Sequence, residues 1–195
     1  MATPYAIVEL ETVESTQDEA RARSHRRTPI LVIAEKQTAG RGRLGRTWVE
    51  PDRALFSSLA FNPSWPTPTW GPIPLVAGLA ARDATEEQCG VTIGLRWPND
   101  LVTEKGKIGG LLVESRNGIV VVGCGINLAW NNPLTGAAAL FGRDSDAVAI
   151  LWWHGERTAS RVRPCGEKFL NRLAGVGNCA ADHVGRIFPA GRKNL

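Results

Sequence analysis

The sequence lacks the paired cysteine motifs that mark zinc sites and thiol–disulfide catalysts. Its four cysteines, Cys89, Cys124, Cys165 and Cys179, form no CxxC pair and no CxxC…HxxxH pattern. Because a structural zinc ion needs several ligands at short spacing, a zinc site is not indicated. Four scattered thiols fit a reducing compartment, and we interpret them as buried or idle side chains.

Long hydrophobic runs are also missing. Residues 1–10 contain no basic region followed by an apolar run, so a secretory signal is not indicated. The longest apolar stretch, from residue 119 to about residue 130, includes glycines and is shorter than the ~20 residues that cross a bilayer. We therefore expect no membrane association and a cytoplasmic location. Internal repeats and low-complexity segments are absent as well.

The composition is otherwise typical of a globular domain. The chain has 195 residues, of which 43% are hydrophobic and 22% charged, which is enough to bury a core. This length fits one catalytic domain, with room for a small appendage. The net charge of +4 attracts anions, but it does not choose among nucleic acid, nucleotides and acidic proteins.

Hydrophobic periodicity predicts strands that alternate with helices. Ser15 is expected to be the N-cap of the first helix, with Asp18 at its capping-box position. Asn117-Gly118 is a strong signal for a hairpin turn. We predict strands at 5–10, 30–34, 54–61, 92–97, 101–102, 108–114 and 119–122, and helices at 15–27, 75–89, 144–162 and 167–174. This order predicts an α+β fold, a mainly antiparallel mixed sheet with the helices packed on one side of it.

A loop rich in glycine and arginine is the first candidate for a binding site. Residues 37–48 have no hydrophobic period and include Gly40–Arg46, GRGRLGR. The glycines allow the backbone to approach a ligand closely, while Arg41, Arg43 and Arg46 offer forked donors to phosphate or carboxylate. Taken alone, the loop is equally consistent with a solvated basic segment or an RNA contact.

Three further motifs follow along the chain. In Arg96–Asp100, RWPND, the chain leaves a strand and turns, so that Asp100 either bonds its own backbone or lies near a metal-bound phosphate. In Lys107–Glu114, KIGGLLVE, glycines inside a strand indicate close backbone approach, although a surface position is the commoner fate of a lysine such as Lys107. Gly123–Asn127, GCGIN, is either a similar close approach or a bulged strand.

Together the four motifs resemble the pattern of the biotin protein ligase family, GRGRxGR, (K)WPND, KxGGxLxE and GxGIN, in this order and at this spacing. Ser15-Thr16-Gln17 resembles the family's Ser-Thr-Asn/Gln segment, and Gln37 stands where the family has a glutamine before the loop. The resemblance covers about residues 14–127 and implies the family's catalytic domain, placed at 1–176. Residues 177–195 resemble the start of the family's small SH3-like C-terminal barrel, here truncated. Only about a dozen residues precede Ser15, so no DNA-binding domain and no DNA partner are expected.

The resemblance implies an ATP-dependent ligase. Such an enzyme activates biotin as biotinyl-5′-AMP and transfers it to a lysine of a biotin carboxyl carrier protein, which belongs to acetyl-CoA carboxylase or a related carboxylase. ATP would bring Mg²⁺ close to Asp100, without a cage of protein ligands around the ion. A homodimer formed through a sheet edge is a further hypothesis.

The resemblance also assigns roles to residues, each of which suits its chemistry. The implied catalytic residues are Lys107, Arg43 and Asp100. The implied biotin-binding residues are Ser15, Thr16, Gln17, Gln37, Gly40, Arg41, Gly42, Arg43, Lys107 and Gly110, with Leu112, Val113 and the strand from Ile119 as walls for the apolar tail. The implied ATP or adenylate residues are Arg41, Arg43, Arg46, Trp48, Asn99, Lys107 and Asn127.

Three residues depart from the family pattern: Arg96 replaces a lysine, Leu44 an arginine and Cys124 an isoleucine. Three alternatives remain open. They are a lipoate ligase of the same fold, an inactive truncated ligase, and a basic RNA-binding module whose contacts would be sensitive to salt. The short C-terminal segment is expected to reduce turnover or to weaken carrier binding.

Overall fold

The computed structural model describes residues 5–24, 28–64 and 66–141. The helices predicted at 144–162 and 167–174, and the predicted domain boundary after residue 176, lie outside these residues. Within them the strands are β1 (Ala6–Val13), β2 (Ile30–Gln37), β3 (Arg53–Phe61), β4 (Gly94–Arg96), β5 (Asp100–Thr103), β6 (Gly106–Arg116) and β7 (Ile119–Ala129). The helices are α1 (Thr16–Arg23) and α2 (Ile73–Cys89), with short 3-10 turns at Arg43–Gly45 and Thr67–Thr69.

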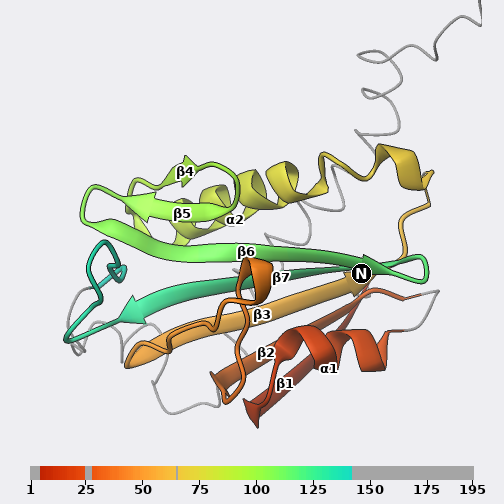
Figure 1. Ribbon diagram of the computed structural model, residues 1–195, viewed down its shortest axis with the longest axis horizontal. Coiled ribbons are helices and arrows are strands. Elements are labelled where there is room, and N and C mark those ends of the chain that lie inside the picture. Colours follow the sequence, from red (N-terminus) through yellow and green to blue (C-terminus); the bar gives the residue numbers. More distant parts are fainter. Residues whose placement is uncertain (1–4, 25–27, 65, 142–195) are drawn as a thin grey trace, which may run out of the picture.

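The seven strands form one sheet in the order β1-β2-β3-β7-β6-β5-β4 (Figure 1). The pair β1–β2 is parallel, and every other neighbouring pair is antiparallel. The prediction of a mainly antiparallel mixed sheet in an α+β fold is therefore confirmed. The long strands β3, β7 and β6 lie side by side at the centre of the sheet. Alternate residues of these strands point to opposite faces of the sheet.

The two helices cover opposite faces of the sheet, so the prediction of helices on one side was wrong. Leu31 and Ile33 of β2 belong to the main core, which also contains the buried face of α2. Ile30 and Val32, which alternate with them, pack instead with Ala20 of α1. Because β2 is apolar on both faces, each face requires its own cover. Figure 1 shows α1 beside β1 and β2, and α2 beside β5 and β6.

The boundaries of α2 follow from its terminal residues. The helix begins at Ile73, two residues before the predicted start, with Pro72 as N-cap and another proline in the first turn. A proline is tolerated there because the first amides of a helix have no intrahelical acceptor. Gly90 ends the helix in the left-handed conformation with φ of 65°, which confirms the predicted C-terminus.

The β6–β7 hairpin also follows its turn signal. Asn117 and Gly118 have φ values of 52° and 79°, as a two-residue turn of this kind requires. Beyond the turn, β7 continues to Ala129 and thus includes the glycine motif, well past the predicted end at residue 122. The antiparallel ladder with β6 sets Gly110 opposite Gly125, which brings two of the motifs together. No helix among the described residues is both long and apolar enough to cross a membrane.

Candidate active site

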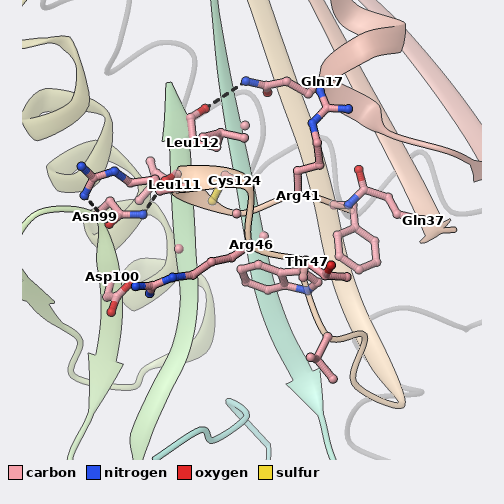
Figure 2. Close-up of a pocket in the computed structure, with 18 of the residues that line it drawn as sticks. Gln17, Gln37, Arg41, Arg46, Thr47, Asn99, Asp100, Leu111, Leu112 and Cys124 are labelled. Carbon is pink, nitrogen blue, oxygen red and sulfur yellow. Dashed lines mark hydrogen bonds between the residues drawn. The ribbon is translucent and has the colours of Figure 1, made fainter. Parts of the chain in front are cut away.

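A cleft of about 450 Å³ opens on the α1 face of the sheet (Figure 2). The start of α1, the glycine loop (residues 40–46), strands β3, β6 and β7, and the β4–β5 turn all contribute to its lining. All of the predicted catalytic, biotin-binding and adenylate-binding residues lie in this lining except Gly40, whereas Val113 and Ile119 of the predicted apolar wall do not. Gly40 is the first residue of the loop, and a Cβ there would meet the Gln37 side chain at 3.1 Å and the Trp48 Cβ at 3.2 Å.

One end of the cleft has a floor of neutral polar groups. Gln37 Oε1 accepts hydrogen bonds from the Thr16 backbone N–H at 2.7 Å and from the Thr16 hydroxyl at 2.9 Å. The Thr16 hydroxyl also lies 2.9 Å from the Ser58 hydroxyl. Ser15 is the N-cap of α1 as predicted, although its side chain makes no capping hydrogen bond. Gln37, from β2, takes over part of the capping by accepting the Thr16 amide.

Gln17 lies behind this floor and is held from several sides. Its side-chain nitrogen donates to the Leu112 carbonyl at 3.2 Å and to the Glu114 carboxylate at 3.3 Å. Its side-chain oxygen accepts a hydrogen bond from Ser58 at 3.2 Å. A Cβ at Gly123 would lie 2.5 Å from that oxygen, so the first glycine of the GCGIN motif makes room for Gln17. Ser58 was not predicted, because nothing in its strand sequence distinguishes it from any other polar strand residue.

A charged cluster occupies the other end of the cleft. The Lys107 amine lies 2.7 Å from Asp100 Oδ1, and the Arg96 guanidinium lies 2.9 Å from Asp100 Oδ2. Burial raises the pKa of Asp100, but hydrogen bonds from Lys107 and Arg96 outweigh burial and hold the pKa below its ordinary value. The Lys107 amine also lies 5.9 Å from the centre of the Trp48 ring, within the range of a cation–π contact.

The backbone of Lys107 is fixed by a segment that the sequence did not indicate. The Lys107 amide donates to the Gly136 carbonyl at 2.9 Å, and the Lys107 carbonyl accepts from the Ala138 amide at 2.7 Å. Gly106 has φ of 136°, and a Cβ there would lie 2.8 Å from the Gly136 carbonyl oxygen. Leu134 and Ala137 of the same segment line the cleft. Residues 134–139 carry no motif and no periodicity that predicts this role.

The glycine loop makes two contacts that hold it over the cleft. The Arg41 guanidinium forms two hydrogen bonds with the Asp18 carboxylate, at 2.5 and 2.7 Å. Asp18 therefore pairs with Arg41 and does not form the capping box that the sequence predicted. Its pKa is lowered, chiefly by the hydrogen bond from Arg41. On the far side, Arg43 donates to Asn99 at 3.3 Å, and Figure 2 shows Arg46 pointing in the direction of Asp100.

Trp48 and Asn127 leave two buried polar atoms without a partner inside the described chain. The Trp48 ring packs edge-on against Phe56, with centroids 6.5 Å apart, and a Cβ at Gly125 would lie 3.1 Å from the ring. The indole nitrogen of Trp48 and the side-chain oxygen of Asn127 are both buried and unbonded. The Asn127 nitrogen donates to the Ala138 carbonyl at 2.9 Å, which fixes the direction of that oxygen. One free donor and one free acceptor therefore remain in the walls of the cleft.

The apolar wall differs from the predicted one. Leu112 lines the cleft, but Val113 packs against the core on the opposite face, as strand alternation requires. Ile119 packs near α1 and is not part of the cleft lining. From β7 the lining includes Gly123, Cys124, Gly125 and Asn127, and at the two glycines the wall is main chain.

Comparison with known proteins places these features in a family. The sequence model of the biotin/lipoate A/B protein ligase family matches residues 9–131. The chain is 40% identical over 104 residues to a biotin--[acetyl-CoA-carboxylase] ligase of Mycobacterium tuberculosis, which covers 51% of this chain and 39% of that protein. It is 38% identical over 150 residues to the ligase of the same name from Paracoccus denitrificans, covering 73% and 59%. The chain thus spans between about two fifths and three fifths of the lengths of these relatives.

Solved structures show the same architecture. The biotin protein ligase of Leishmania major in complex with biotinyl-5-AMP superposes with a TM-score of 0.70 and 28% identity, over 90% of this chain and 76% of that one. The ligase of Aquifex aeolicus in complex with biotin and ATP superposes with a TM-score of 0.68 and 27% identity, over 90% and 71%. Since the family match covers more than half of the chain and includes all four motifs, this protein belongs to the biotin/lipoate A/B protein ligase family.

Proposed function

We propose that this protein activates biotin with ATP and transfers the biotinyl group to a lysine of a carrier protein. One observation carries the proposal. One end of a single cleft has the neutral polar floor of Thr16 and Gln37. The other end has the Lys107–Asp100 ion pair together with the arginines of the glycine loop. The relatives support the choice of substrate, because two of them are named biotin--[acetyl-CoA-carboxylase] ligases and solved neighbours hold biotinyl-5-AMP, or biotin with ATP.

The polar floor suits the ureido ring of biotin. That ring presents two N–H donors and one carbonyl acceptor and carries no charge, so it requires neutral partners of both kinds. Ser15, Thr16 and Gln37 can both donate and accept hydrogen bonds. Ser15 is buried yet free of a capping bond, and is therefore available to a ligand. Leu112 and the bare backbone of β7 offer an apolar surface to the rest of the molecule.

In the proposed first step, a carboxylate oxygen of biotin attacks the α-phosphorus of ATP, and the bond to the leaving pyrophosphate breaks. Negative charge gathers around that phosphorus as the step proceeds. Lys107, Arg43 and Arg46 carry fixed positive charge at this end of the cleft, and they would stabilise the charge without any covalent role. Asp100 would hold the Lys107 amine in place while the cleft is empty.

In the proposed second step, the amine of the carrier lysine attacks the carbonyl carbon of the mixed anhydride. The bond from that carbon to the phosphate oxygen breaks, AMP leaves, and the amine loses a proton to solvent. Holding the adenylate between the steps requires partners for its base. The unbonded Trp48 donor and Asn127 acceptor offer a matched pair of sites for this purpose.

Direct binding of a magnesium ion does not fit the described residues. Asp100 is the only carboxylate among the residues that line the cleft, and both of its oxygens are already paired with cationic groups. No group of three or more histidine, cysteine or acidic residues in the described chain could hold a metal. Mg²⁺ enters this proposal only as the counterion that ATP brings, and no protein-bound magnesium is proposed.

A lipoate ligase of the same family is the main competing activity. The dithiolane ring of lipoate has no N–H and no carbonyl, so it would leave the floor of Thr16 and Gln37 without ligand partners. The buried Ser15 side chain, which makes no capping hydrogen bond, would then also lack a ligand partner, and polar groups left unpaired in this way discriminate strongly between substrates. The geometry therefore favours biotin.

The test combines two measurements. The full chain is mixed with biotin, ATP, Mg²⁺ and a biotin carrier domain, and pyrophosphate release is measured together with the mass of the carrier. Pyrophosphate and a mass gain of one biotinyl group are expected, with lipoate a poor competitor. Absence of pyrophosphate would overturn the proposal. Faster pyrophosphate release with lipoate than with biotin would show that lipoate, and not biotin, is the substrate. Pyrophosphate without carrier modification would support activation and contradict transfer.

A further inference from the structure

Asp18 lies in the first turn of α1, and the sequence assigned it no role in binding or catalysis. We propose that Asp18 is a positioning residue, which anchors the glycine loop to α1 through Arg41 and so sets where Arg43 and Arg46 stand over the cleft. The consequence for catalysis rests on the proposed function. The anchor itself does not, and it can be measured without any substrate.

The geometry of the contact is that of a specific anchor. Both terminal nitrogens of Arg41 bond to the two oxygens of Asp18, at 2.5 and 2.7 Å. Such forked pairs fix the relative orientation of two groups as well as their distance. Most exposed ion pairs contribute little to stability, but paired geometry of this kind is the recognised exception. The hydrogen bond from Arg41 also lowers the pKa of Asp18, which favours the charged carboxylate that the pair requires.

The loop has few other side-chain contacts. Among the described residues, the side chains of 40–46 form hydrogen bonds with Asp18 and, across the cleft, with Asn99 at 3.3 Å. Two backbone bonds are internal to the loop, from Gly42 N–H to the Arg46 carbonyl at 2.7 Å and from Arg46 N–H to the Arg43 carbonyl at 3.3 Å, and the Gly40 carbonyl accepts a hydrogen bond from the Trp48 N–H at 2.9 Å. These internal bonds make the loop a unit, and Arg41 is where that unit is attached to the helix.

The same helix turn also carries the polar floor of the cleft. Thr16 and Gln17 precede Asp18 directly, and both make buried hydrogen bonds to the sheet. The anchor therefore starts from a rigid base, and it joins the biotin end of the cleft to the arginines at the phosphate end. Without it, Arg43 and Arg46 would keep their charges but lose a fixed position relative to the floor.

The first test measures loop exposure in the absence of substrates. Trypsin cleaves after arginine, so it reports on the accessibility of residues 41, 43 and 46. Asp18→Asn keeps the shape of the side chain and removes its charge. Glu19→Gln is the matched control, because Glu19 pairs with Arg23 at 2.9 Å on the same helix and does not contact the loop. We expect Asp18→Asn to cleave about two- to fivefold faster in the loop, in line with the loss of one ion pair, and Glu19→Gln to match the wild type.

The second test measures retention of activated biotin. Biotin and ATP are supplied without carrier, and hydroxylamine traps any activated biotin that leaves the site. Asp18→Asn should raise the trapped fraction about two- to fivefold without changing the melting temperature, and Glu19→Gln should not. The double variant Asp18→Arg/Arg41→Asp should recover part of the retention, which a merely structural role of Asp18 would not predict.

Equal trypsin cleavage in the wild type and Asp18→Asn would overturn the anchor. Equal effects of Asp18→Asn and Glu19→Gln would also overturn it, because they would show a general effect on α1. If the wild type releases no pyrophosphate from biotin and ATP, the proposed function fails. The trypsin comparison still decides the anchor in that case.

Discussion

The Lys107 amine and the Asp100 carboxylate form an ion pair at 2.7 Å in the wall of the cleft, where Asp100 is also bound to Arg96. Lys107 is the second residue of β6 and Asp100 is the first residue of β5, so the bulged pairing of these two strands sets their distance. One carboxylate thus faces two cations, which leaves net positive charge on the side of the cleft where a phosphate would lie.

The first prediction concerns Lys107. Lys107→Met keeps the length of the side chain and removes its charge, so biotin-dependent pyrophosphate release should fall roughly 100- to 1,000-fold, the usual effect of losing one donor to developing charge. Lys105→Met is the control, since Lys105 is exposed in the preceding turn and does not line the cleft. Similar rates for the two variants would show that Lys107 has no special role.

The second prediction concerns pH. Because the folded-state pKa of Asp100 is lowered, its ion pairs stabilise the fold above the pKa of the unfolded chain, and that contribution is lost as the pH falls through the folded-state value. Wild type and Asp100→Asn should therefore differ in urea midpoint at pH 7, and this difference should shrink as the pH falls below about 4, the ordinary pKa of an aspartate. A constant difference across this range would mean that the charge of Asp100 does not stabilise the fold.

The third prediction concerns Gly123. Gly123→Ala places a Cβ 2.5 Å from the Gln17 side-chain oxygen, so Gln17 must shift and the polar floor with it. We expect a loss of about 1–3 kcal/mol in the free energy of unfolding, as for other overpacked sites, and a raised KM for biotin. Gly71→Ala serves as control, because no atom lies within 4 Å of its Cβ position. Calorimetry and biotin-dependent kinetics check both effects, and unchanged values for Gly123→Ala would contradict the described contact.

The fourth prediction concerns Trp48. Trp48→Phe removes the unbonded indole N–H, which relieves one buried polar group while reducing the packing against Gly125. These effects oppose each other, so the unfolding free energy of the free protein should change by less than about 1 kcal/mol. If the N–H binds the nucleotide, the KM for ATP should rise about three- to tenfold, the range for one hydrogen bond. Trp97→Phe, at a side chain 80% exposed and outside the cleft lining, should leave the KM unchanged.

Much of the site was predictable from the sequence because its residues are carried by short motifs. The four motifs together resemble the pattern of one family, and that resemblance singled out Lys107, Asp100 and Arg43 before any fold was known. Ser58 and residues 134–139 belong to no such motif. Their roles depend on which strand faces which segment, and that is decided by long-range pairing.

The strand pattern had a similar limit. Strand centres followed from hydrophobic alternation, and α2 ended at Gly90 as predicted. The side of the sheet on which α1 packs did not follow, because β2 is apolar on both faces and its sequence does not say which helix covers which face. Arg41 illustrates the same limit within the site, since its partner Asp18 is 23 residues away in the chain.

The bare stretch of β7 at Gly123 and Gly125 has a consequence for changing what the cleft accepts. A ligand resting there would meet peptide groups, whose positions are fixed by hydrogen-bonded ladders to β3 and β6 on either side. Peptide groups cannot be exchanged by substitution, and any added side chain would collide with Gln17 or Trp48. Attempts to enlarge or reshape the cleft for other acids are therefore best directed at the opposite wall, in the α1 start and the glycine loop, where side chains form the surface.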